Sequence, residues 1–243
     1  MRRVYEGMRS SGSLGASLAE HGLADLAMYE GRWADAEKLL REGIVADEKS
    51  NDRLARAAKL IALAEVHLAQ NRTPQAVRAA QDATSITRED VTIVPAALVM
   101  IRAGRPAEAQ AIASELGQRL QRRSRAYAAI IEGEIARAAR RFGDAKDAFE
   151  RAQKLADLWL GRFLLGVMYV DSEQYASAQA ELGLAESRRG EATAVFLDDV
   201  PSFRYLAPLP YWLARAQEGM NKVSPAAAEN YRKVIALRPD ASG

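Results

Sequence analysis

The sequence predicts an all-α solenoid of about six helix-turn-helix repeats, because small residues recur along it at regular intervals. One small residue marks the first helix of each of six blocks: Ala24, Ala64, Ala97, Gly133, Gly166 and Ala214. A second follows at the same interval in five blocks and one position later in the sixth: Ala36, Ala76, Ala109, Ala145, Ala178 and Ala227. Small residues at a crossing let two helices approach closely, and each helix pair must then stack on its neighbours to bury its apolar surface.

The blocks predict a single domain over residues 1–243, with about twelve main helices. The approximate repeats are 17–50, 57–89, 90–120, 126–157, 159–189 and 207–240. Gly166 and Ala214 are farther apart than any other two neighbouring first-helix residues, so residues 190–206 form an irregular insertion. We expect a short helix near Glu191–Leu197, a long helix starting at Pro208 or Pro210, and a last helix over Pro225–Arg238.

The insertion carries three aromatic residues, Phe196, Phe203 and Tyr205. Two interpretations are open: the rings plug the solenoid, or they form a docking epitope. Because exposed aromatic clusters are costly, the plug is favoured, and it predicts that Phe196 and Tyr205 are largely buried.

The N-terminal residues indicate that something precedes them. Val4, Tyr5 and Met8, followed by a run of serine and glycine at 10–13, look like the end of a helix. We therefore expect that the chain was cut from a longer one and that Met1 was added.

Composition excludes several classes of protein. The 34 basic and 32 acidic residues leave a net charge of +2, too small for a dedicated nucleic-acid or membrane-surface binder. The chain has no cysteine and only two histidines, His21 and His67, so we expect no metal and no cofactor. No apolar stretch reaches the roughly 20 residues needed to span a bilayer, so we expect a soluble, cytoplasmic protein with no membrane partner.

The blocks resemble the tetratricopeptide repeat (TPR) over roughly residues 17–239. The aromatic residue expected before the second helix is present as Trp33, Phe142 and Tyr175, but blocks two and three have Thr73 and Pro106 there. The resemblance implies a right-handed superhelix that binds proteins.

A narrower resemblance covers the C-terminal third. The segments 188–193, 196–201, 204–206 and 211–213 look like the C-terminal repeat region of bacterial, acidobacterial-type, eukaryotic-like serine/threonine kinases. In such proteins the repeats follow a kinase domain and bind partners or regulate. This chain has neither the glycine-rich loop nor the catalytic motifs of a kinase, and we expect no enzymatic activity. The predicted function is a non-catalytic protein-protein interaction module, a scaffold or regulatory part of a larger signalling protein such as a kinase.

The TPR resemblance also implies which residues bind a partner, since first helices line the concave face in that family. Transferring the register gives one row formed by His21, Ile61, Val94, Ile130, Phe163 and Tyr211. The adjacent row is Asp25, Glu65, Leu98, Glu134, Val167 and Arg215. Together they predict an acidic groove with an apolar floor, suited to a peptide with Lys or Arg between apolar anchors. The alternative is that the apolar row packs within the protein.

The alternative function is a nucleic-acid-binding helical array that uses the basic residues from Arg119 to Arg141. Few aromatic residues accompany them, only Tyr127 and Phe142, which weakens base stacking and favours a solvated ridge. A protein or peptide partner is therefore preferred over nucleic acid.

Overall fold

The structure is a computed structural model that describes residues 2–192, 200 and 203–237. Those residues contain fourteen α-helices, one short 3₁₀ helix and no strand, so the predicted all-α fold is confirmed. The helices are α1 (Arg2–Met8), α2 (Gly12–Tyr29), α3 (Trp33–Ser50), α4 (Arg53–Ala69), α5 (Thr73–Ile86), α6 (Asp90–Arg102), α7 (Pro106–Gly117), α8 (Arg122–Ala138), α9 (Phe142–Leu155), α10 (Trp159–Asp171), α11 (Tyr175–Ser187), α12 (Arg189–Ala192), η1 (Phe203–Tyr205), α13 (Leu209–Met220) and α14 (Pro225–Ala236).

All of the α-helices except the short α1 and α12 correspond to the main helices expected from the sequence. A short helix, α12, spans Arg189–Ala192 and overlaps the start of the helix predicted near Glu191–Leu197, whose remaining residues lie outside the described ones. The next long helix begins at Leu209, between the two prolines expected to start it, with Pro210 in its first turn. The last helix begins at Pro225, as predicted, and ends at Ala236.

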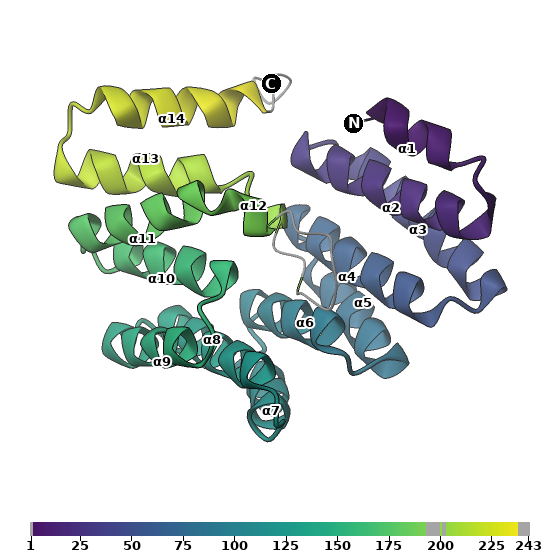
Figure 1. The fold of residues 1–243 in the computed structure, drawn as a ribbon, viewed down its shortest axis with the longest axis horizontal. Coiled ribbons are helices and arrows are strands. Elements are labelled where there is room, and N and C mark those ends of the chain that lie inside the picture. The colour runs from purple at the N-terminus through teal and green to yellow at the C-terminus, as the bar shows by residue number, and fades with distance from the viewer. Residues whose placement is uncertain (1, 193–199, 201–202, 238–243) are drawn as a thin grey trace. The chain divides into compact units, whose positions relative to one another are not determined.

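The chain forms two compact units, residues 1–105 and 106–243, and each is described by itself. In the first unit, α2 packs on α3, α3 on α4, and α4 on both α5 and α6 (Figure 1). In the second, α7 packs on α8, α8 on α9, α10 on α11, and α13 on α11 and α14. Antiparallel neighbours therefore stack along the chain inside each unit. The single domain predicted over residues 1–243 stays a prediction.

The helix crossings inside the pairs are built from the small residues that the sequence singled out. Ala36, Ala145 and Ala178 are fully buried. A Cβ added at Gly133 would come within 2.9 Å of the Phe149 ring, and one at Gly166 within 2.6 Å of Leu182. A large residue of the second helix thus packs directly on the backbone of the first, and only glycine leaves it room.

The turn inside five of the helix pairs repeats one backbone geometry. The residue seven positions after the first small residue is left-handed in each: Gly31, Asn71, Gly104, Arg140 and Glu173, with φ between 57° and 76°. The following residue donates its backbone N–H to a carbonyl of the preceding helix, as Arg32 does to Ala27 at 2.8 Å. This is the Schellman termination of a helix. In the sixth pair, where the two small residues are one position farther apart, the corresponding Asn221 has an extended φ of −148°.

Candidate protein-binding surface

The predicted apolar row is mostly buried. Ile61, Val94, Ile130 and Phe163 are 0–2% exposed, whereas Tyr211 is half-buried. The first four side chains therefore make packing contacts in place of the open apolar floor expected from the sequence. Only Tyr211, on α13, leaves part of its surface accessible.

The predicted acidic row is paired with basic residues. Glu65 on α4 contacts Arg102 of α6, and Asp25 lies 3.6 Å from Nε2 of His21 on the same helix. Glu134 is buried and accepts hydrogen bonds of 2.7 and 2.9 Å from Arg137. These pairs offset the negative field that the sequence register predicts, so the surface does not present a row of free carboxylates.

Arg137 also joins neighbouring repeats. Its Nη1 lies 2.6 Å from Oδ2 of Asp171, the last residue of α10. Burial opposes the charged form of this guanidinium, but Glu134 and Asp171 outweigh it and raise the pKa of Arg137. The sequence does not identify Arg137 and Arg102 as the partners of the acidic row. The signal in the sequence is weak, because both arginines follow a first-helix small residue closely but have no fixed spacing to the acid they meet.

A cluster of buried aromatic residues lies on α8 and α10 in the second unit. The Trp159 and Phe163 rings stack, with centroids 5.5 Å apart and planes 5° from parallel. The Tyr205 ring from η1 lies 5.5 Å from Phe163, and the backbone N–H of Val200 donates to the Tyr127 hydroxyl at 3.3 Å. Two residues of the predicted insertion thus rest on two first helices. Tyr205 is half-buried, and Phe196 lies outside the described residues.

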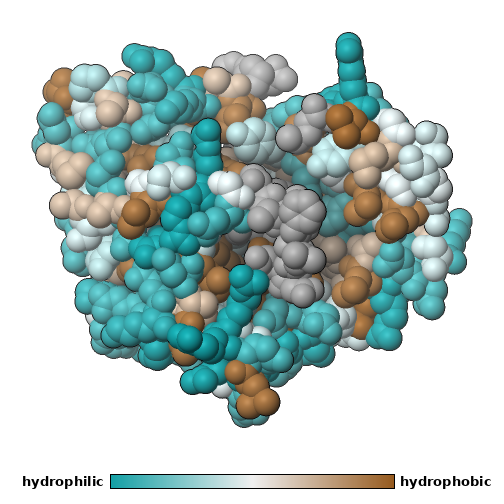
Figure 2. Space-filling view, in the orientation of Figure 1, coloured by the Kyte–Doolittle hydropathy of each residue, from teal (hydrophilic) through white to brown (hydrophobic). Residues whose placement is uncertain are grey.

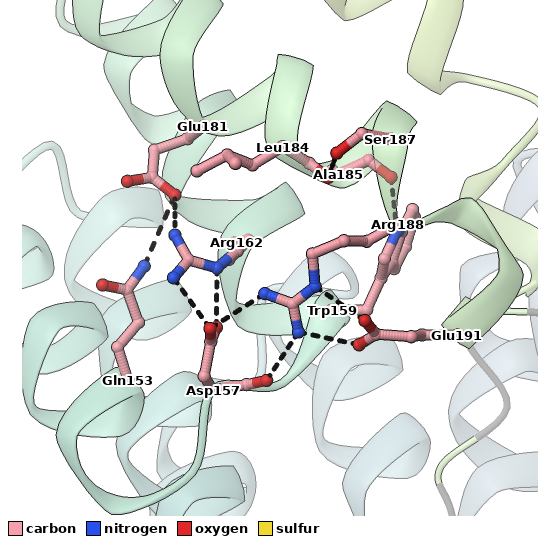
Figure 3. Close-up of polar contacts among 10 residues, drawn as sticks. All are labelled: Gln153, Asp157, Trp159, Arg162, Glu181, Leu184, Ala185, Ser187, Arg188 and Glu191. Carbon is pink, nitrogen blue, oxygen red and sulfur yellow. Dashed lines mark hydrogen bonds and ion pairs between the residues drawn. The ribbon is translucent and has the colours of Figure 1, made fainter.

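A network of arginines and carboxylates fixes the start of that insertion (Figure 3). Asp157, between α9 and α10, accepts hydrogen bonds from Arg162 at 2.6 and 2.8 Å and from Arg188 at 2.8 Å. Arg188 also donates to the backbone carbonyl of Asp157 at 3.0 Å. It forms a bidentate pair with Glu191 of α12, with both contacts at 2.7 Å. The indole of Trp159 donates to the carbonyl of Ala185 at 2.8 Å. Arg188 therefore ties α12 to the loop that begins α10.

The charges of this network stabilise each other. Hydrogen bonding from Arg162 lowers the pKa of Asp157, against a smaller opposing effect of burial, and Arg188 adds to the lowering. Arg188 likewise lowers the pKa of Glu191. Because the side chains of Asp157 and Glu191 are 43% and 51% exposed, solvent screens much of this stabilisation.

A second aromatic group lies on α13 and α14, around the accessible residue of the predicted row. The Tyr211 ring meets Trp212 edge-on at 5.2 Å and Tyr231 at 6.2 Å. Arg215, which is exposed, donates to the Tyr211 hydroxyl at 3.0 Å. Burial and a 2.7 Å hydrogen bond to Glu218 raise the pKa of Tyr231 to about 12. Half-buried rings beside an exposed guanidinium can take an apolar side chain and a carboxylate together.

The basic residues from Arg119 to Arg141 are largely engaged within the protein. Arg119 pairs with Glu115 at 2.8 Å and Arg141 with Asp144 at 2.7 Å. The guanidinium of Arg140 lies over the Phe142 ring, 5.5 Å from its centroid. Together with the pairing of Arg137, these contacts reduce the charge available to a phosphate backbone.

Hydropathy does not single out a binding surface on the face shown in Figure 2, where hydrophobic residues form small separate groups among hydrophilic ones. Across the described part of the chain, no helix combines the length and apolar content needed to cross a membrane. The same residues contain no group of three His, Asp or Glu side chains placed to hold a metal ion.

Comparison with known proteins supports the fold. The chain is similar to PilW, a widely conserved type IV pilus biogenesis factor of known crystal structure, with a TM-score of 0.50 and 16% identity over 93% of this chain and 96% of that one. A tetratricopeptide repeat protein from Parabacteroides merdae aligns with a TM-score of 0.45 and 14% identity over 91% of this chain and 80% of that one. The likeness to PilW is one of fold, an all-α stack of helix pairs.

One curated relative also matches by sequence. The regulatory protein AfsR of Streptomyces griseus is 31% identical over 105 residues, which cover 43% of this chain and 10% of that protein. The match therefore spans about a tenth of the length of this relative. No protein-family model matches the chain.

Proposed function

We propose that the chain is a non-catalytic protein-protein interaction module that serves a larger regulatory protein. The observation that carries this proposal is the fold, because stacked helix pairs create extended surfaces that suit protein partners. The match to a segment of a regulatory protein supports the larger context. A cytoplasmic location and a serine/threonine kinase as the parent protein are part of the proposal, the latter supported by the C-terminal resemblance. Reading the parent gene tests it: a kinase domain encoded upstream is expected.

The partner binds, in this proposal, at Tyr211 and Arg215. Both belong to the rows predicted from the sequence, and both keep accessible surface, whereas Ile130 and Phe163 of the same unit are buried. Since Glu65 and Glu134 are paired with arginines, they no longer favour a basic partner. A peptide with a carboxylate for Arg215 and an apolar side chain for Tyr211 fits this surface better than a basic one.

The test is recovery of partners from a lysate of the source organism on the immobilised chain. We expect the Tyr211→Ala, Arg215→Ala double variant to lose a protein that the wild type retains. Leu120→Ala is the matched control, since Leu120 is 93% exposed in the same unit. Equal recovery by all three chains would reject this surface. Salt-sensitive recovery of nucleic acid without protein would favour the alternative function.

A further inference from the structure

We propose that the side of α2 that carries Leu18, together with α1, docks an amphipathic α-helix of a partner protein. The partner helix takes the place of a further first helix in the stack and presents a large aliphatic side chain toward α2. The inference rests on the proposed function and deepens it, because it gives the interaction module a binding surface in the first unit and names the kind of partner.

The short helix α1 packs on α2 in the way that a second helix packs on the next first helix (Figure 1). Inside the units, α3 contacts α4, α5 contacts α6, α9 contacts α10 and α11 contacts α13. A Cβ at Gly22 of α2 would come within 2.2 Å of the Tyr5 ring of α1, and one at Gly219 of α13 within 2.4 Å of the Tyr175 ring of α11. α1 therefore occupies the place of a second helix, and it has no paired first helix among the described residues.

The register of Leu18 is one that faces a preceding first helix elsewhere in the fold. Lys59 and Gly161 lie five residues before the small residues of α4 and α10. The Lys59 ammonium donates to Ser17 of α2, and a Cβ at Gly161 would lie 3.2 Å from Ile130 of α8. Both positions thus face the first helix before their own. Leu18 stands one residue before the same position in α2, so it faces the place of a first helix that would precede α2.

Leu18 is exposed where its counterpart is covered. It is 50% exposed, whereas Leu160, at the same register of α10 and beside α8, is 3% exposed. Leu14, one turn earlier on α2, and Val4 on α1 are exposed as well. Removing such aliphatic surface from water favours association, so this side of α2 is suited to a helix that continues the stack.

The contact between α8 and α10 defines what the partner helix presents. There the aliphatic side chain of Ile130 packs against α10 next to Leu160. On α2, Leu18 stands in place of Leu160. A helix with an aliphatic side chain in the register of Ile130 therefore fits α2 as α8 fits α10, with the side chains of one helix lying between those of the other.

The experiment uses the full 243-residue chain and a fluorescein-labelled synthetic peptide of residues 122–138, the sequence of α8. Fluorescence anisotropy measures its affinity for the wild type, for Leu18→Glu and for the matched control Val45→Glu, which changes a 51% exposed side chain of α3. We expect saturable binding to the wild type and at least about tenfold weaker binding to Leu18→Glu, because a carboxylate then lies in the apolar contact. The control should bind like the wild type, and circular dichroism checks that both variants are folded.

A second peptide identifies the side chain that enters the contact. Ile130→Asn, made in the peptide alone, keeps its charge and length and leaves the chain itself unchanged. This peptide should bind the wild type at least about tenfold more weakly than the unaltered one. Equal binding of the two peptides would reject an aliphatic contact at α2.

A fusion tests the site without relying on the helicity of a free peptide. Residues 122–138 are joined to the N-terminus of the chain through a flexible glycine-serine linker, which raises the effective concentration of the helix to about a millimolar. We expect the urea midpoint of the fusion to exceed that of the unfused chain. Leu18→Glu should remove this gain, whereas Val45→Glu should leave it in place.

Absence of both peptide binding and the gain in the fusion would overturn the inference, and so would equal binding by the wild type and a folded Leu18→Glu chain. Sedimentation equilibrium covers another occupant: a dimer of the chain that Leu18→Glu dissociates would assign the surface to a second copy and overturn the partner helix.

The inference and the proposed function fail separately. If the α8 peptide does not bind while Tyr211 and Arg215 still recover a lysate protein, the proposed function stands and the inference falls. Binding of the peptide through Leu18 together with no such protein would retain the α2 surface and reject the Tyr211 surface alone.

Discussion

Each of the two units has a polar centre that joins three segments of the chain, and the two centres differ in burial. In the first unit, Nζ of Lys59 on α4 donates to Oδ2 of Asp47 on α3 at 2.6 Å and to Oγ of Ser17 on α2 at 2.8 Å. Lys59 and Asp47 are 0% and 1% exposed. In the second unit, Asp157 and Arg188 join their segments with side chains that are 43% and 26% exposed.

Ion pairs of similar geometry therefore have different structural roles in the two units. Breaking a buried pair leaves a charge without water or partner, whereas water replaces the partner of an exposed one. Packing in the first unit reflects this, because a Cβ at Gly43 would come within 2.6 Å of the Lys59 side chain. The lysine therefore occupies space that a glycine of α3 leaves open. The carboxylate of the Asp157 centre, by contrast, is reached by water.

The largest effect is expected from Asp47→Ala. It leaves the Lys59 ammonium buried with only Ser17 as a partner, and should reduce the free energy of unfolding by about 3–5 kcal/mol. Urea denaturation measures this loss. The double variant Lys59→Met, Asp47→Leu is the control, because replacing both charges by apolar groups should cost little or stabilise. A loss below about 1 kcal/mol in the single variant would contradict the assigned role of burial.

An apolar crossing of the second unit should come next. Ala145 is fully buried where α9 crosses α8, so Ala145→Leu should destabilise by about 1–3 kcal/mol through overpacking. Ala178→Leu should behave alike at the crossing of α11 and α10. Denaturation midpoints unchanged in both variants would show that neither alanine lies at a tight crossing.

Stability measured against pH should distinguish the two units, because His67 in the first unit and Asp157 in the second affect it over different pH ranges. Burial, followed by the charge of Arg72, lowers the pKa of His67 on α4. Its neutral form then contributes stability that is present above about pH 6.5 and falls as the pH drops from there, by at most about 1.4 kcal/mol per unit. For Asp157, whose pKa is lowered, the contribution is present above about pH 4 and is lost as the pH falls through the native pKa.

The wild type should lose stability between pH 7.5 and pH 5.5, measured as a fall in the urea midpoint. His67→Leu should abolish the part of this fall that comes from His67, whereas the control His21→Gln should retain it. A wild-type midpoint that does not change over this range would contradict the prediction for His67.

Removal of the carboxylate at the more exposed centre, Asp157, should have a smaller effect. Asp157→Ala should lower the free energy of unfolding by at most about 1 kcal/mol, because Arg162 keeps Glu181 and Arg188 keeps Glu191 as a partner. In 1 M salt the difference from the wild type should shrink further, since the screening length falls to about 3 Å. Denaturation at low and high salt measures both values. A loss above about 2 kcal/mol, independent of salt, would place Asp157 with the buried centre.

The smallest effect is expected at the turns, where the units differ again. The first unit has Gly31, Asn71 and Gly104 at the left-handed position, whereas the second has Arg140 and Glu173 and no glycine there. Glu173→Gly should stabilise the second unit by about 0.5 kcal/mol, because relief of the left-handed strain slightly exceeds the entropy that glycine adds to the unfolded chain. Gly104→Ala should have the opposite sign. Thermal denaturation compares them, and two shifts of the same sign would contradict the explanation.

The helix pairs and their crossings could be predicted from the sequence alone. The regular interval between small residues predicted the crossings at which Ala36, Ala145 and Ala178 are buried, and the longer interval of the last block coincides with the one turn that is extended at Asn221. These features are readable because they depend on contacts inside a pair, where residue spacing and distance are tied together.

The side chains that pair between repeats, and the surface that stays open, could be found only in the tertiary structure. Glu65 contacts Arg102 of another helix, Lys59 pairs with Asp47 across a helix crossing, and Tyr205 lies on Phe163. The sequence alone leaves several basic residues as possible partners of each acid. Which of them forms the pair depends on how one helix pair is stacked on the next. The contact of Tyr205 with Phe163 has the same origin, because it depends on where α10 lies in the stack, and no local spacing encodes that position.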